Sequence, residues 1–122
     1  MRLDRNAIAP GPVIAGFSRG GFRIDEKVFR ALLITPERAD GWTPPPIAEL
    51  TEGDVAAVLD PAPEFVLLGT GATLVRPPAA FVSALEKRGI GVEAMDSRAA
   101  ARAWGMLRAE GRQIVGALYP LD

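Results

Sequence analysis

Two short segments of the sequence combine glycines and polar side chains in a way that could bind a ligand. Gly69-Thr70-Gly71 follows one apolar run, Asp96-Ser97-Arg98 follows another, and Arg102 comes one helical turn later. Backbone N–H groups at glycines, together with arginine side chains, can hold a phosphate or a carboxylate. The predicted site for an anion or another small molecule therefore comprises Gly69, Thr70, Gly71, Asp96, Arg98 and Arg102.

The same residues also have a structural interpretation. Gly69-Thr70-Gly71 matches neither the dinucleotide-binding pattern nor the phosphate loop, and two glycines also permit a tight turn. Arg98 and Arg102 lie near the predicted N-terminus of a helix, where the helix dipole disfavours cations. An internal ion pair would offset that cost, and we favour it over a bound ligand. The carboxylates that could supply the pair are Asp96, Glu93 and Glu64.

Trp42 is a further candidate, because it lies in the middle of a predicted loop. Residues 36–46 include Gly41 and three consecutive prolines, which break or fix the backbone. A tryptophan in such a loop can anchor a partner protein, or it can fold back over the edge of the core as a lid. We favour the lid and keep the partner-binding role open.

The composition excludes several kinds of catalysis. The chain has no histidine and no cysteine, so Cys–His nucleophiles, Ser–His–Asp triads and structural zinc sites are excluded. Asp96 and Glu93 are three residues apart on a predicted strand and project to opposite faces, so they do not form a carboxylate pair. The sequence identifies no catalytic residue, metal site or cofactor. It favours a non-catalytic role without deciding whether the protein is an enzyme.

Net charge and hydropathy limit the classes of partner and the cellular locations that we expect for the protein. The formal net charge is −1, whereas nucleic-acid-binding proteins carry a concentrated basic surface. The N-terminal residues lack the apolar core of a signal peptide, and no apolar run reaches membrane-spanning length. We therefore expect a cytoplasmic protein without a transmembrane segment, which binds no nucleic acid.

The apolar pattern predicts an α/β fold. An N-terminal antiparallel meander is followed by two strand–helix–strand units, which imply parallel strands in a mixed sheet. The meander either extends that sheet or packs beside it. We expect one domain over residues 1–122, with an irregular arm over 1–11. The predicted strands cover residues 13–18, 22–24, 28–35, 65–68, 90–95 and 113–119, and the predicted helices cover 52–60, 77–88 and 96–110.

Local signals fix several of these ends. Thr51 and Asp54 have the spacing of a capping box, Asp96 or Ser97 can cap the last helix, and Gly89 stands where a left-handed C-terminal cap belongs. Gly105 lies inside a predicted helix, where glycine costs about 1 kcal/mol relative to alanine. We therefore expect another backbone or the Trp104 ring to pack closely against it.

Several sequence blocks resemble a small family of unknown function that occurs in bacteria, archaea and mitochondria. The blocks are Gly16-Phe17, Gly20-Gly21-Phe22, Leu67-Leu68-Gly69-Thr70-Gly71, Gly89-Ile90-Gly91-Val92-Glu93, Asp96, Ala99, Ala100, Arg102, Leu107, Glu110, Gly111 and Arg112. They span almost the whole chain. The resemblance implies a three-layer α/β fold with a mixed sheet. The mitochondrial member is respiratory complex I assembly factor 3, so the resemblance also implies a non-catalytic role in building complex I beside another assembly factor.

The chain departs from the family at Ala103-Trp104-Gly105, where members usually have Thr-Tyr-Asn. The departure weakens a shared polar site more than it weakens a shared partner-binding surface. We therefore expect a protein partner, either a subunit of a respiratory NADH dehydrogenase or another assembly factor, bound through Trp42 or Arg102 at the inner membrane. Self-association through free strand edges is an alternative.

Overall fold

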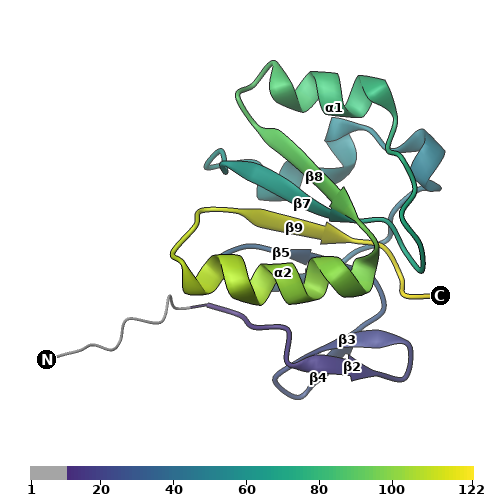
Figure 1. Ribbon diagram of the computed structural model, residues 1–122, viewed down its shortest axis with the longest axis vertical. Helices are drawn as coiled ribbons and strands as arrows, with labels where there is room; N and C mark the ends of the chain where they lie inside the picture. Colours follow the sequence, from purple (N-terminus) through teal and green to yellow (C-terminus); the bar gives the residue numbers. More distant parts are fainter. Residues whose placement is uncertain (1–10) are drawn as a thin grey trace, which may run out of the picture.

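Two β-sheets and two α-helices dominate the computed structural model, which describes residues 11–122 (Figure 1). A three-stranded sheet has the order β2-β3-β4, and a five-stranded sheet has the order β6-β5-β9-β7-β8. The elements are β2 (Gly16–Ser18), β3 (Gly21–Ile24), β4 (Lys27–Phe29), β5 (Leu32–Ile34), β6 (Ala39–Gly41), the 3-10 helices η1 (Ile47–Glu49) and η2 (Glu52–Val58), β7 (Phe65–Gly69), α1 (Ala79–Glu86), β8 (Gly91–Met95), α2 (Ser97–Ala109) and β9 (Val115–Leu118).

The five-stranded sheet is mixed, as the sequence predicts. β7 pairs in parallel with both β8 and β9, and β9 pairs antiparallel with β5. The apolar run that forms β7 lies between two other strands and is buried from Val66 onward, which explains why it lacks the alternation of a one-sided strand. The two strand–helix–strand units place α1 and α2 between parallel strands.

Apolar side chains fill both faces of this sheet and give the predicted three layers. On one face, Phe81 and Leu85 of α1 pack with Val55 of η2. On the other face, Trp104 of α2 packs with Phe22 of the three-stranded sheet. Figure 1 shows α2 lying just below β9 in the view and the three-stranded sheet lying below α2. The meander therefore packs beside the main sheet.

The predicted strand over residues 28–35 is wrong, because the chain divides there into two strands. β4 belongs to the three-stranded sheet, whereas β5 belongs to the five-stranded sheet. The backbone bends at Arg30 and Ala31 between them. One straight strand cannot serve two sheets, and the single charged residue at the bend, Arg30, does not distinguish a break from a polar position within one continuous strand.

The loop predicted over residues 36–46 contains a strand, which corrects that prediction. β6 pairs antiparallel with β5, with Gly41 opposite Leu32 and Ala39 opposite Ile34. The prolines lie on either side of this strand, at 36 and at 44–46. They therefore bound the strand without removing a donor from its ladder.

Most of the predicted helix signals are confirmed. The Asp54 side chain accepts from the Thr51 backbone N–H at 2.8 Å, Asp96 caps α2 by accepting from the Ala99 N–H at 3.1 Å, and Gly89 has a φ of 78°. The prediction that another backbone packs closely against Gly105 is wrong, because a Cβ there would meet nothing within 4 Å beyond its chain neighbours and its own helix backbone. The predicted arm lies outside the described residues except for Gly11.

None of the helices within residues 11–122 has the combination of length and apolar character that a bilayer crossing requires.

Candidate functional site

The predicted ligand-binding loops meet at one edge of the five-stranded sheet. β7 and β8 are parallel, so their carboxyl ends lie side by side. The Thr70 N–H donates to the Met95 carbonyl at 2.9 Å, and the Ser97 N–H donates to the Gly71 carbonyl at 2.8 Å. The structure therefore brings Gly69-Thr70-Gly71 together with the start of α2.

The buried side chain of Ser97 connects the strand ends at this edge through hydrogen bonds. Its side chain has no exposed area. Its Oγ accepts from the Gly71 N–H at 2.8 Å and donates to the Tyr119 carbonyl at 2.8 Å. A Cβ at Gly69 would lie 2.8 Å from this Oγ, so only glycine fits there without displacing the serine. The sequence predicts for Ser97 only a possible helix cap, because no nearby residue reveals its two distant partners.

Thr70 holds the loop that follows β7. Its Oγ1 donates to the Thr73 carbonyl at 2.7 Å and accepts from the Val75 N–H at 3.0 Å. The N–H groups of both Thr70 and Gly71 are also donated to acceptors within the protein. These are the groups on which an anion site at this loop would depend, and they are already engaged.

The ion pair predicted for Arg98 and Arg102 is not formed. Within residues 11–122, neither side chain has a carboxylate partner, and Glu64 pairs instead with Arg112 at 2.9 Å. The backbone N–H of Gln113 and then the Arg112 guanidinium lower the pKa of Glu64. The sequence prediction failed because Arg112 lies far from Glu64 along the chain.

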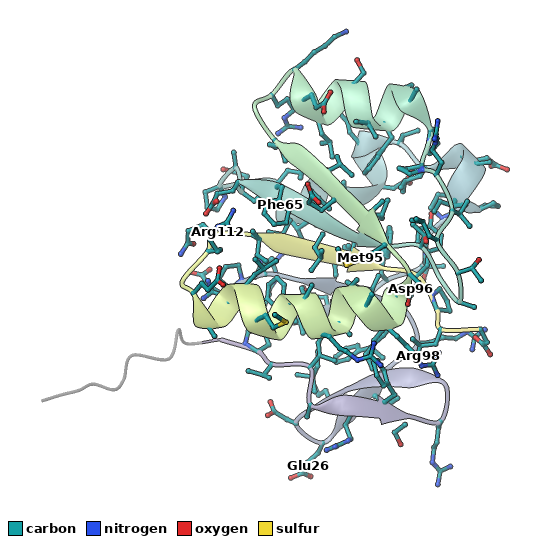
Figure 2. The ribbon with its side chains drawn as sticks, viewed as in Figure 1. Glu26, Phe65, Met95, Asp96, Arg98 and Arg112 are labelled. Atoms are coloured by element: carbon teal, nitrogen blue, oxygen red, sulfur yellow. The ribbon has the colours of Figure 1, made fainter. Side chains whose placement is uncertain are left out.

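Arg98 instead lies against an aromatic ring of the three-stranded sheet. Its guanidinium carbon is 5.3 Å from the centroid of the Phe17 ring, a distance that allows a cation–π contact. Figure 2 shows Arg98 at the end of α2 that faces this sheet, with Asp96 beside it. The contact connects α2 with β2 at the protein surface.

Four exposed residues form one continuous surface, which we call the α2 surface. Arg98, Arg102 and Met106 follow one another at intervals of four residues and therefore share one side of α2. Phe17 continues the surface through its contact with Arg98. Met106 is 68% exposed and Phe17 is 37% exposed. Arginine, methionine and aromatic residues are the types enriched in protein interfaces.

Trp42 lies where the lid interpretation places it. Its Nε1 donates to the Asp54 carbonyl at 3.1 Å, and its ring lies edge-on to the Tyr119 ring with centroids 5.2 Å apart. The Tyr119 hydroxyl donates to the Pro45 carbonyl at 2.7 Å. Burial, followed by the charge of Asp54, raises the pKa of Tyr119 to about 12. The indole thus fastens the proline-rich segment and η2 to the sheet.

Two hollows in the structure lie away from all of these residues. One has a volume of about 120 Å³ and lies between the β5–β6 hairpin, the segment 57–63 and the start of β9. The other, of about 580 Å³, is an open groove between the β3–β4 turn and the same hairpin. None of the residues predicted as a site lines either hollow.

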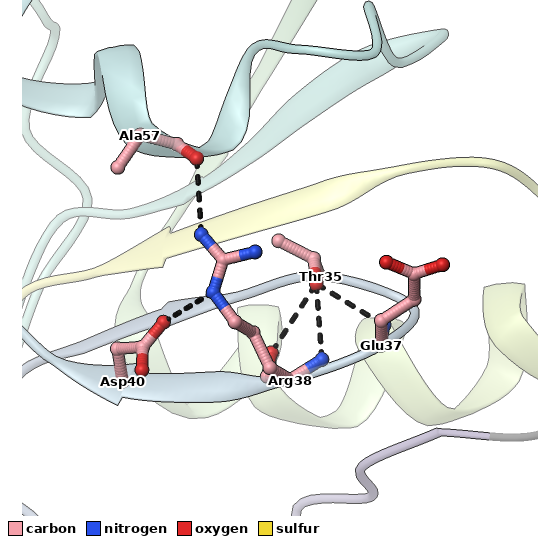
Figure 3. Close-up of polar contacts among 5 residues, drawn as sticks. All are labelled: Thr35, Glu37, Arg38, Asp40 and Ala57. Atoms are coloured by element: carbon pink, nitrogen blue, oxygen red, sulfur yellow. Dashed lines mark hydrogen bonds and ion pairs between the residues drawn. The ribbon is translucent and has the colours of Figure 1, made fainter.

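The polar groups beside the smaller hollow bind one another (Figure 3). The Arg38 Nε donates to Asp40 at 2.7 Å, and an Arg38 terminal nitrogen donates to the Ala57 carbonyl at 3.1 Å. The Thr35 Oγ1 accepts from the backbone N–H groups of Glu37 and Arg38. These contacts hold the β5–β6 hairpin against η2, which is a structural role.

Comparison with known proteins connects the chain to a family. The model of the family described as "Protein of unknown function (DUF498/DUF598)" matches residues 14–119. The match covers all twelve strands and helices from β2 to β9.

Two relatives illustrate the range of this similarity. A Danio rerio protein named NADH dehydrogenase (ubiquinone) 1 alpha subcomplex assembly factor 3 is 32% identical over 123 aligned residues, which cover 98% of this chain and 71% of the relative. An uncharacterised protein of Rhodobacter capsulatus is 35% identical over 111 residues, which cover 88% of this chain and 84% of the relative. The chain spans only 60% of the corresponding mouse assembly factor.

Solved structures share the fold. A crystal structure of a Bordetella parapertussis protein superposes with a TM-score of 0.82 at 32% identity and covers 91% of this chain and 97% of that chain. A solution structure of a Bordetella pertussis protein, described as a Mth938-like domain, has a TM-score of 0.71 at 28% identity and covers 100% of this chain and 94% of that chain.

Proposed function

Because the chain belongs to the DUF498/DUF598 family of proteins of unknown function, we propose that it is a non-catalytic factor that binds a protein partner during assembly of a respiratory NADH dehydrogenase. Its similarity to an assembly factor in Danio rerio supports this role. The partner is a subunit of that enzyme or a second assembly factor. The protein acts in the cytoplasm and reaches the inner membrane through its partner.

The α2 surface carries this proposal. Phe17 and Met106 expose apolar area there, and Arg98 and Arg102 supply cations between them. Arginine is one of the residue types enriched in binding hot spots, and methionine and phenylalanine are enriched in protein interfaces. Trp42 is not part of this surface, because its indole packs against Tyr119 and donates to Asp54.

Electrostatics indicate what kind of partner fits. Arg98 and Arg102 lie in the first two turns of α2, where the helix dipole adds positive potential. Within the described residues no carboxylate forms an ion pair with either cation. The partner surface therefore carries carboxylates facing these arginines and apolar side chains facing Met106. Such complementarity chiefly raises the association rate and the specificity.

Protein binding has more support than binding of a small anion. The N–H groups of Thr70 and Gly71 are engaged with Met95 and Ser97, so an anion would have to displace internal hydrogen bonds. The α2 surface is exposed and needs no rearrangement to bind a partner.

The test is affinity capture of the tagged protein from mildly solubilised host cells, with the bound proteins identified by mass spectrometry. We expect the unaltered protein to enrich NADH dehydrogenase subunits or their assembly factors, and Arg102→Glu to lose them. Lys87→Glu is the matched control, because Lys87 is an exposed residue that follows α1. It undergoes the same reversal of charge away from the α2 surface.

Thermal unfolding of all three proteins shows whether the variants remain folded. Arg102 is exposed, so its replacement should leave the unfolding temperature nearly unchanged. If Arg102→Glu retains the same NADH dehydrogenase proteins as Lys87→Glu, the α2 surface is not the binding site. If no such protein is enriched by any of the three, the assembly role itself is refuted.

A further inference from the structure

The two edges of the five-stranded sheet differ in how they are protected. β6, at one edge, has three residues and carries Asp40, which is paired with Arg38. β8, at the other edge, has five residues, and β7 is its only strand neighbour within residues 11–122. Natural edge strands are usually protected by lysine, proline, a bulge or short length. Residues 91–95 contain neither lysine nor proline and carry one charge, that of Glu93, so the greater length of β8 makes it the less protected edge.

The ladder shows which backbone groups of β8 are free. The Gly91 N–H donates to the Glu64 carbonyl at 3.1 Å, and the Met95 carbonyl accepts from the Thr70 N–H at 2.9 Å. Alternate residues of a strand face the same neighbour, so the backbone of Gly91, Glu93 and Met95 faces β7. The N–H and C=O groups of Val92 and Ala94 consequently point away from the sheet. Within residues 11–122 no strand pairs with them.

A second copy of the chain fits this edge poorly. The antiparallel register that uses all four free groups pairs Val92 with Ala94 of the copy and Glu93 with Glu93. Like charges directly opposite each other destabilise a strand pair. Shifting the register toward the ends of β8 does not help, because the N–H of Ile90 and the carbonyl of Asp96 are already bonded within the protein.

A basic partner strand fits the same edge. Glu93 is exposed on β8 and has no ion-pair partner among the described residues. A lysine or arginine opposite Glu93 would replace the repulsion of the self-pair by an attraction. Val92 and Ala94 lie on the other face of β8, where they are partly buried against the apolar core, so flanking small or apolar residues of a partner can extend that core.

We propose that β8 is a docking edge for an extended segment of another protein, which adds a sixth strand to the sheet and places a lysine or arginine opposite Glu93. Main-chain hydrogen bonds to Val92 and Ala94 hold the segment, and Glu93 selects its charge. This edge is separate from the α2 surface, so the inference does not rest on the assembly role.

The test selects short linear peptides from a displayed random library on the unaltered protein, with soluble Ala94→Pro present as a competitor. Proline at this position removes a donor that faces outward and leaves the ladder to β7 intact. We expect the selected peptides to be enriched in lysine or arginine and to bind Ala94→Pro about 10-fold or more weakly. Their binding should slow hydrogen exchange at the amides of Val92 and Ala94.

A charge-reversed variant provides an independent arm. Library selection on Glu93→Lys should yield peptides rich in aspartate or glutamate, because the backbone edge is unchanged and only its charge differs. Arg102→Glu should bind the original peptides as tightly as the unaltered protein does, which separates this edge from the α2 surface. Unfolding measurements on Ala94→Pro and Glu93→Lys check that both remain folded.

Three results would overturn the inference. The first is that no selected peptide distinguishes the unaltered protein from Ala94→Pro. The second is that the selected peptides show no charge preference that follows residue 93. The third is that sedimentation shows a dimer of the unaltered protein that Ala94→Pro abolishes, because the edge would then bind a second copy of the chain.

Discussion

Removing the Ser97 hydroxyl should strongly destabilise the protein, although the hydroxyl is a small group. Ser97→Ala leaves the Gly71 N–H and the Tyr119 carbonyl without their side-chain partner in a buried site. An unsatisfied buried polar group costs about 1–3 kcal/mol, so the two groups together should lower the free energy of unfolding by about 2–6 kcal/mol. That loss is a large part of the roughly 5–15 kcal/mol by which native proteins are stable.

Urea denaturation at equilibrium measures the effect. With a typical denaturant slope of about 2 kcal/mol per molar urea, the midpoint should fall by about 1–3 M. Ser83→Ala is the control, because Ser83 is exposed on α1 and alanine is a good helix former. We expect the midpoint of Ser83→Ala to stay the same or rise slightly.

Hydrogen exchange locates the change. The Gly71 amide donates to the Ser97 Oγ, so its exchange should accelerate in Ser97→Ala more than that of amides in the centre of β7. If the free energies of unfolding of Ser97→Ala and Ser83→Ala differ by less than about 0.5 kcal/mol, the two hydrogen bonds do not hold the strand ends together and the reasoning is refuted.

Two further predictions follow from single residues. Gly105→Ala should raise the free energy of unfolding by about 1 kcal/mol, because a Cβ meets nothing there and alanine favours the helix. Gly116→Ala should lower the free energy of unfolding, because its Cβ would lie 2.7 Å from the Ile34 side chain. Urea denaturation measures both changes, and changes of the same sign would contradict these two predictions. Tyr119 is the only tyrosine, so the absorbance of tyrosinate should show it ionising near pH 12 in the native protein and near 10 in urea. Because the native state holds the proton more tightly, this contribution to stability is complete below about pH 10 and is lost as the pH rises from about 10 to 12; a native titration near 10 would contradict the burial of the hydroxyl.

The helix ends and the central strand could be predicted because their signals are local. Gly89 takes the left-handed conformation that an L side chain resists, and Asp96 reaches an N–H only three residues away. The apolar run of β7 has no polar face to expose, which places it inside a sheet. In each case the residue type and its near neighbours are sufficient, so distant parts of the chain do not alter the outcome.

The composition of the candidate site depends on contacts between distant parts of the chain. The sequence could not show that Glu64 pairs with Arg112, that Arg98 lies on Phe17, or that Ser97 reaches Tyr119. Each pair is brought together by the strand order and by the layers that pack on the sheet. A carboxylate near a cation in sequence is therefore a weak guide to its partner in space.

The sequence by itself determined the fold class, the exclusion of histidine and cysteine chemistry, and the residues at the turns and caps, because these follow from residue types and short spacings. Only the tertiary structure decided that residues 28–35 serve two sheets and that, in the part of the chain that the structure describes, β8 ends the larger sheet with unpaired backbone groups. The physical reason is that strand pairing joins segments across long stretches of chain. The same apolar pattern is compatible with several partners until packing on both faces of the sheet selects one.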